Sequence, residues 1–140
     1  MNAKAQQTYA TAARAGLTGR ALEAALFNQI AVEIERCVSD DRVDIDALQR
    51  AVDRNRTFWA LVGGDAAAPE SSLPGDLKRD LQGLCAWTMK QSVRALVDPR
   101  PPQVLPLARI NRILAEGLSA RPDPVGPAGA PSPLRGPVAA

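Results

Sequence analysis

The side chains that most often carry out catalysis are scarce in this chain of 140 residues. It contains no histidine, which excludes Ser-His-Asp and Cys-His catalysis and any zinc site that needs imidazole. Its two cysteines, Cys37 and Cys85, lie too far apart to form a CxxC redox or metal pair. Both occur within apolar stripes, so we interpret them as small core residues. We therefore expect neither an enzyme nor a cofactor.

Four aspartates lie close together in the sequence and raise the question of a calcium site. They are Asp40, Asp41, Asp44 and Asp46. An EF-hand loop needs a central glycine and a terminal glutamate, and this segment has neither. Turn and helix-cap chemistry explains the cluster better, because aspartate favours both positions. The sequence predicts no metal site.

The charges of the chain are nearly balanced. Lys and Arg number 17 against 15 Asp and Glu, a formal net charge of +2, which does not indicate the strongly basic surface typical of phosphate binding. The densest group of cations is Arg50, Arg54, Arg56, Lys78 and Arg79. Interleaved aspartates favour a solvated helix face. RNA contact is the alternative, although aromatic platforms and a nucleic-acid fold signature are missing.

The distribution of apolar residues argues against membrane insertion. No apolar run approaches the roughly 18 residues of a membrane span. The N-terminus lacks the apolar centre of a secretion signal. We expect a cytoplasmic protein whose thiols are reduced.

Two segments in the first half of the chain show the apolar spacing of amphipathic helices. The first, residues 18–38, starts at Thr18 as N-cap, and its stripe is Leu22, Leu26, Ile30, Ile34 and Cys37. The second starts at Asp44, and its stripe is Ile45, Leu48, Val52, Asn55, Trp59 and Val62. We expect Gly63 and Gly64 to end the second helix.

Two further helices are expected in the second half. The third has Ser71 or Ser72 as its cap and Pro74 in its first turn, and Pro99, Pro101 and Pro102 forbid its continuation. Its expected buried side is Leu77, Leu81, Leu84, Cys85, Thr88 and Leu96, extended by Trp87 and Met89. The fourth covers residues 105–118, with Leu107, Ile110, Ile113, Leu114 and Leu118. With no convincing strand, the sequence predicts an all-α, four-helix domain with short connections.

The ends of the chain differ from its middle in composition. We divide it into a flexible N-terminal segment (1–16), a helical domain (17–119) and a Pro/Gly/Ala-rich tail (120–140). The tail has few large apolar residues to offset the entropy of ordering, so we expect it to be disordered.

Three residues on the expected helices have two interpretations. Asn55 lies in line with apolar residues, so its amide must be paired or cost about 1–3 kcal/mol; it is either a satisfied core amide or a group that holds the 69–74 loop or meets a partner's backbone. Trp59 and Trp87 are either core residues or, in one case, the lining of a groove for an incoming helix.

Several short motifs, in this order and spacing, resemble one known family. They are Tyr9, Arg20–Glu23, Asn55–Trp59, Pro69–Pro74 with Leu77, Leu81, Leu84 and Trp87, then Ile110–Arg112 and Gly117–Leu118. Together they resemble the FlaF family of flagellar-biosynthesis proteins over about residues 9–118. Ser71 stands where the family has Asn, and both residues cap helices well.

The resemblance implies a cytoplasmic factor needed for flagellin production and export. It implies either a secretion chaperone that binds flagellin, or a post-transcriptional regulator that acts on flagellin mRNA beside the mRNA-associated protein FlbT. In the first case a terminal flagellin segment, which becomes an amphipathic helix on assembly, would bind in a groove. We expect Asn55, Trp59, Leu73 and Trp87 to shape that groove. A purely structural helical module is the third possibility.

Overall fold

The computed structural model describes residues 19–69 and 74–120 of the chain. In chain order its elements are α2 (Gly19–Glu35), β1 (Val38–Ser39), β2 (Arg42–Val43), α3 (Ile45–Ala67), α4 (Gly75–Val97) and α5 (Pro101–Ser119). This confirms the predicted all-α, four-helix domain. The predicted flexible segment (1–16) and the predicted disordered tail (120–140), apart from Ala120 at the C-cap of α5, lie outside the described residues.

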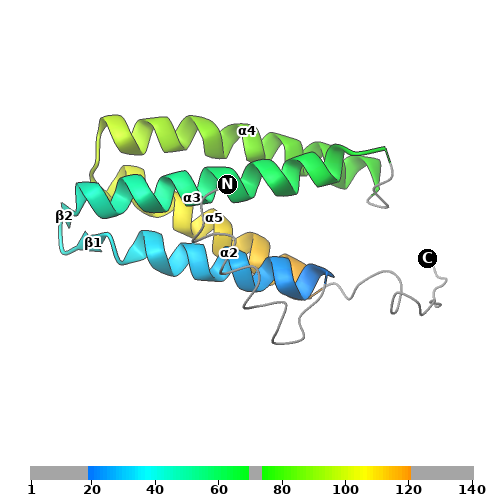
Figure 1. Cartoon of the computed structure of the whole chain (residues 1–140), viewed down its shortest axis with the longest axis horizontal. Coiled ribbons are helices and arrows are strands. Elements are labelled where there is room, and N and C mark those ends of the chain that lie inside the picture. Colours follow the sequence, from blue (N-terminus) through cyan, green and yellow to red (C-terminus); the bar gives the residue numbers. More distant parts are fainter. Residues whose placement is uncertain (1–18, 70–73, 121–140) are drawn as a thin grey trace.

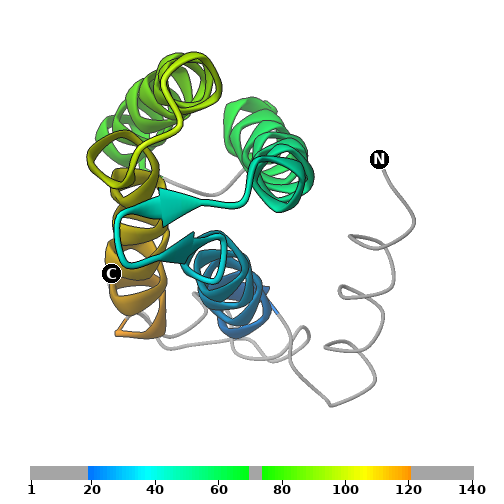
Figure 2. The same ribbon diagram turned by 90° about the vertical axis from the view of Figure 1, so that its left-hand side faces the viewer.

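The four helices form a bundle in which each packs mainly against two neighbours. Helix α2 contacts α3 and α5, and α4 contacts α3 and α5, an arrangement visible from the end of the bundle (Figure 2). Helix α5 crosses the bundle obliquely, from the end of α4 towards the start of α2 (Figure 1). Within the described ranges, no helix is both long and apolar enough to cross a membrane.

The core is built from the apolar stripes that the spacing predicted for α2 and α3. All five stripe residues of the first predicted helix are buried, as are Leu48, Val52, Asn55, Trp59 and Val62 on α3. Phe27 lies edge-on to Phe58 at 4.7 Å and to Trp59 at 5.1 Å between ring centroids, a favoured geometry for aromatic pairs. These rings join α2 to α3.

The connection between α2 and α3 differs from the prediction. Helix α2 ends at Glu35 rather than Val38, and a short antiparallel hairpin follows in which Val38 pairs with Val43. Asp40 adopts a left-handed conformation in the turn, with φ of 60°, which aspartate tolerates better than most residues. The two valines pack against the core, so burial of these β-branched side chains favours strand over further helix.

Three helix boundaries were also wrong. Helix α4 begins at Gly75 with Pro74 as its N-cap, where a serine cap and Pro74 in the first turn were predicted. Helix α3 continues through Gly63 and Gly64 to Ala67, because packing against α4 outweighs the roughly 1 kcal/mol that each glycine costs in a helix. Helix α5 begins at Pro101, not Leu105. Proline is well tolerated at the first helical position, where its missing N–H would have no partner. The prolines that stop α4 therefore also start α5.

Four apolar residues expected on buried faces are exposed: Ile45, Trp87, Leu96 and Ile113. Ile45 is the first residue of α3 and lies at the end of the bundle. On α5, Asn111 and Ala115 take the inward positions, which turns Ile113 outward. On α4 the inward positions belong largely to polar residues, and Trp87 and Leu96 lie outside them.

Candidate functional site

A buried cluster of polar side chains joins α3 to α5. The Asn111 amide of α5 donates from Nδ2 to Oδ1 of Asn55 over 2.7 Å, and its Oδ1 accepts from Nε1 of Trp59 over 2.8 Å. All three side chains are 0% exposed. Asn55 and Trp59 are one helical turn apart, so they face the same helix. Together they hold α5 at a defined position across the core.

Asn111 is the member of this cluster that sequence reasoning missed as a site residue. It lies in line with the buried residues Val104, Leu107 and Ala115, which is the signal that drew attention to Asn55. The cluster satisfies Asn55 only in part, because Asn55 Nδ2 has no hydrogen-bond partner. Of the two interpretations of Asn55, the satisfied core amide therefore holds for its oxygen alone.

Outside this cluster, α5 exposes a mixed apolar and charged face beside α2. We call this surface the α5 groove; its main lining residues are Asn28 and Glu35 on α2 and Pro102, Leu105, Pro106, Arg109, Ile113 and Glu116 on α5. Leu105 is 39% and Ile113 is 55% exposed. Leu105, Arg109 and Ile113 follow one another at four-residue spacing, so they form one ridge along the helix.

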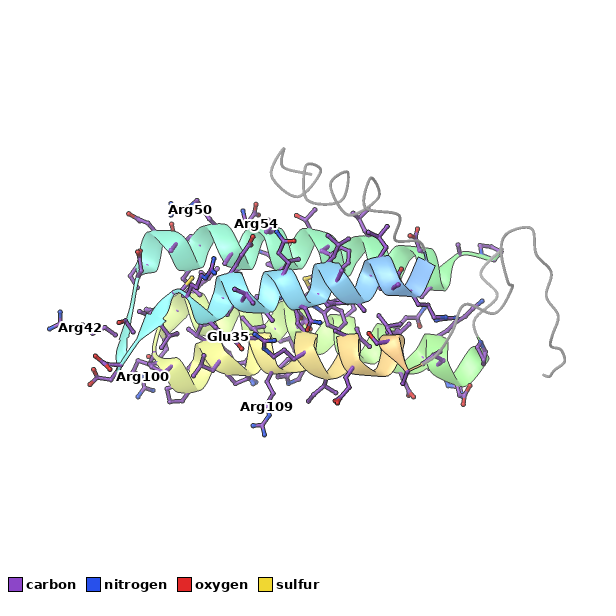
Figure 3. All side chains as sticks on the ribbon, turned by 90° about the horizontal axis from the view of Figure 1, so that it is seen from below. Glu35, Arg42, Arg50, Arg54, Arg100 and Arg109 are labelled. Atoms are coloured by element: carbon purple, nitrogen blue, oxygen red, sulfur yellow. The ribbon has the colours of Figure 1, made fainter. Side chains whose placement is uncertain are left out.

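The charges in the α5 groove fall into a paired set and an unpaired one. Glu35 accepts from Arg112 at two points, Nε at 2.8 Å and NH2 at 2.5 Å, and this hydrogen bonding lowers the pKa of the Glu35 carboxyl. Arg109 projects away from α5, whereas Glu35 lies between α2 and α5 (Figure 3). Arg109 makes no ion pair with any described residue. Its charge is available to a partner.

Small residues beneath the Glu35–Arg112 pair let α2 and α5 approach closely. Ala31 lies one turn before Glu35, and Ala108 lies one turn before Arg112; both are at most 1% exposed. The α5 groove above them is open rather than enclosed, which suits a helical guest that lies on it rather than a small molecule that needs an enclosed pocket.

The remaining predicted site residues lie elsewhere. Trp87 is on α4 and 37% exposed, so it does not belong to the Asn55–Trp59–Asn111 cluster. Leu73, Ser71 and Ser72 lie outside the described residues. Asn55 and Trp59 are enclosed by the core and can affect a partner only through the position of α5.

One residue of the cation cluster and one of the aspartate cluster have partners within the fold. Arg54 donates to Glu33 of α2 over 2.6 Å, which ties one predicted RNA-binding cation to its own fold. Asp44 caps α3, its carboxylate accepting from the N–H of Ala47 over 3.1 Å. Among the described residues, no group of three metal-ligating side chains could hold an ion.

The two thiols are in environments that disfavour reaction. Burial raises the pKa of the Cys37 thiol, with a smaller contribution from Asp44, and burial also raises the pKa of Cys85. Since the thiolate is the nucleophile and metal ligand, both residues remain protonated at neutral pH. The Cys85 thiol donates weakly to the carbonyl of Trp59 over 3.6 Å.

Comparison with known proteins agrees with the motifs. No curated protein and no solved structure matches this chain. A family model described as "Flagellar protein FlaF" matches residues 5–118, which include all four described helices except the last residue of α5. The chain therefore belongs to the FlaF family of flagellar proteins.

Proposed function

We propose that this protein binds flagellin in the cytoplasm as a secretion chaperone or adaptor, and thereby promotes flagellin synthesis and export. The observation that supports this most is the α5 groove, where Leu105 and Ile113 remain 39% and 55% exposed. Family membership makes the protein flagellar. The apolar ridge supplies a surface that a helical flagellin segment can cover.

The ridge suits helix-in-groove recognition. An amphipathic guest helix presents apolar side chains at three- and four-residue spacing, and Leu105 and Ile113 lie two turns apart on α5. Arg109, between them, can pair with a carboxylate of the guest. A few such anchors dominate the affinity, while the ordering of an unfolded guest costs about 2–5 kcal/mol. The resulting modest affinity permits release to the export machinery.

The predicted residues Asn55 and Trp59 take an indirect part in this proposal. They hold Asn111, and Asn111 fixes the helix whose outer side carries the ridge. Trp87, which is not among the lining residues of the α5 groove, and Leu73, which lies outside the described residues, stay predicted partner contacts.

Titration of the full-length protein with purified flagellin tests the proposal. Leu105→Ser combined with Ile113→Ser should weaken binding by at least about tenfold, because each substitution removes roughly 1–2 kcal/mol of apolar burial. Leu61→Ser on α3 is the matched control, since Leu61 is 42% and Leu105 is 39% exposed. Exposed substitutions change stability by about 0.5 kcal/mol or less, so all variants should fold. Unchanged binding by the double variant would refute the use of this ridge.

Regulation of flagellin mRNA, alone or with FlbT, is the competing proposal. The cations that would contact the RNA are compensated in part, since Arg54 pairs with Glu33. The two functions respond oppositely to salt: phosphate binding weakens by about 10³–10⁵ between 50 and 200 mM salt when several phosphates are contacted, whereas apolar binding holds or strengthens. Titrations against flagellin and against its mRNA leader at these two salt concentrations separate them.

A further inference from the structure

The C-terminal half of α4 is inverted with respect to an ordinary bundle helix. Its buried side carries the polar residues Thr88, Gln91 and Ser92, of which Thr88 and Ser92 are 0% exposed. Its exposed side carries large apolar residues: Trp87 (37%), Val93 (54%), Leu96 (37%) and Val97 (78%). Surface helices normally show the reverse distribution, and contiguous exposed apolar surface usually marks an interaction site.

One hydrogen bond between helices holds this inversion in place, and a second pairs a buried hydroxyl within α4. Gln91 donates from Nε2 to the backbone oxygen of Gln103 on α5 over 2.8 Å, and the Ser92 hydroxyl donates to the carbonyl of Thr88 over 2.7 Å. Rotation of α4 to bury its valines would break the Gln91 bond and expose these groups. The apolar face therefore remains outside as a consequence of the folded arrangement.

The outward apolar residues have the spacing of a coiled-coil seam. Ala86, Met89, Val93 and Leu96 follow one another at steps of three, four and three, the a and d positions of nearly two heptads. Ala86 is exposed and Met89 is partly buried. Val97 extends the seam at its end. This length and period match a second helix laid along α4.

The charges beside this seam are all positive. Residues 81–97 contain Lys90 and Arg94 and no aspartate or glutamate. Both cations are exposed, and neither forms an ion pair within the described part of the chain. Lys90 follows Met89 directly, at a position that in coiled coils pairs with an acidic residue of the partner helix.

We propose that this outward face of α4 binds an acidic amphipathic helix of a second protein, in coiled-coil fashion, independently of the α5 groove. The partner helix would supply apolar residues at heptad spacing to cover Val93 and Leu96, and carboxylates to pair with Lys90 and Arg94. The protein would then have two docking surfaces, one for cargo on α5 and one for an acidic helix on α4.

Charge complementarity favours this occupant over the other candidates. The chain's own residues 1–18 contain Lys4 and Arg14 and no acidic residue, and residues 121–140 contain two arginines against one aspartate. A second copy docked through α4 would place like cations on both sides of the seam, which is unfavourable. An acidic helix avoids both conflicts.

Binding of two designed peptides to the full-length protein tests the proposal. Both are three-heptad helices with leucine at a and d; one has glutamate at e and g, and the other has lysine there. Like charges keep each peptide from pairing with itself. Measured by fluorescence anisotropy at about 50 mM salt, the glutamate peptide should bind at least about tenfold more tightly than the lysine peptide. The preference should shrink at about 500 mM salt.

Matched variants show whether peptide binding depends on the seam. Val93→Ser should weaken glutamate-peptide binding at least about fivefold, while Leu61→Ser, on α3 and 42% exposed, should leave it unchanged. Lys90→Glu with Arg94→Glu should reverse the charge preference, with circular dichroism confirming that each variant is folded.

Three results would overturn the proposal. The first is equal binding, or none, of the two peptides. The second is binding of the protein to vesicles of phosphatidylcholine and phosphatidylglycerol that Val93→Ser abolishes, which would assign the face to an anionic membrane surface. The third is a dimer, seen by sedimentation velocity, that Val93→Ser dissociates, which would assign it to a second copy.

Discussion

Removal of the Asn111 side chain is the most informative perturbation of this fold. Asn111→Ala deletes both hydrogen bonds of the buried cluster and leaves Trp59 Nε1 and Asn55 Oδ1 without partners in a site that is 0% exposed. An unsatisfied buried polar group costs about 1–3 kcal/mol, so the two together cost about 2–6 kcal/mol. Domains of this size have about 5–15 kcal/mol in total, so the variant should be close to unfolding.

A double variant separates the loss of the hydrogen bonds from the cost of unpaired buried groups. Asn55→Leu combined with Asn111→Leu removes the same hydrogen bonds but leaves only Trp59 Nε1 unpaired, and it also removes Asn55 Nδ2, which already lacks a partner. Replacing both partners by apolar groups of similar shape can be nearly neutral. The double variant should therefore be more stable than Asn111→Ala, by about 1–3 kcal/mol, although it changes more residues.

Urea unfolding followed by far-UV circular dichroism and by tryptophan fluorescence measures these differences. Coincident transitions support two-state unfolding, and an unchanged m-value attributes a shift in midpoint to stability. A loss of less than about 1 kcal/mol for Asn111→Ala, or a double variant less stable than the single one, would refute the assigned role of the cluster.

Three further predictions concern other parts of the bundle. Gly64→Ala should stabilise the protein by about 0.5–1 kcal/mol through helix propensity, since nothing lies within 4 Å of an added Cβ, whereas Gly63→Ala should gain less because its Cβ would lie 3.3 Å from a sulfur on α4; thermal unfolding compares them. The Glu35 pKa is lowered by its arginine partner, so the stabilising effect of this carboxylate is present above the ordinary glutamate pKa and is lost as the pH falls through the lowered value. Glu35→Gln should therefore reduce the stability lost on acidification by up to about 1 kcal/mol. Urea midpoints measured against pH check this. Trp87→Phe leaves Trp59, which is 0% exposed, as the sole tryptophan, so the remaining fluorescence should be blue-shifted and resist acrylamide quenching.

The sequence predicted the fold best where one pattern dominated. The stripe of α2, the stripe of α3 from Leu48 onward and the Asp44 cap follow from spacing and capping chemistry alone, and the structure confirms them. The boundary errors arose where tertiary packing decides. Gly63 reads as a stop signal in isolation, but α4 packs over it so closely that Cys85 would contact a Cβ there, and this packing carries α3 onward.

The orientation of α4 was less predictable, because this helix has two possible buried faces. Its spacing placed Leu96 and Trp87 on the buried side with Leu81. The structure instead buries Gln91 and Ser92, and the Gln91 bond goes to a backbone oxygen of α5, a partner that no local pattern reveals. Where two faces of a helix have similar apolar content, hydrophobic periodicity alone does not indicate which of them is buried.

Buried polar groups therefore explain both where the core lies and why apolar side chains remain outside it. Asn55 and Asn111 fix α5 against α3, which turns Ile113 and Arg109 outward; Gln91 fixes α4 against α5, which turns its valines outward. In each case a hydrogen bond between helices holds an orientation that burial of apolar area alone would not favour. If the exposed apolar stripes contributed only to stability, replacing the buried amides by leucine would leave those stripes exposed as before. If the amides instead maintain binding surfaces, the stable Asn55→Leu/Asn111→Leu variant should bind flagellin more weakly than the wild-type protein while remaining folded, because α5 is then free to rotate its ridge inward.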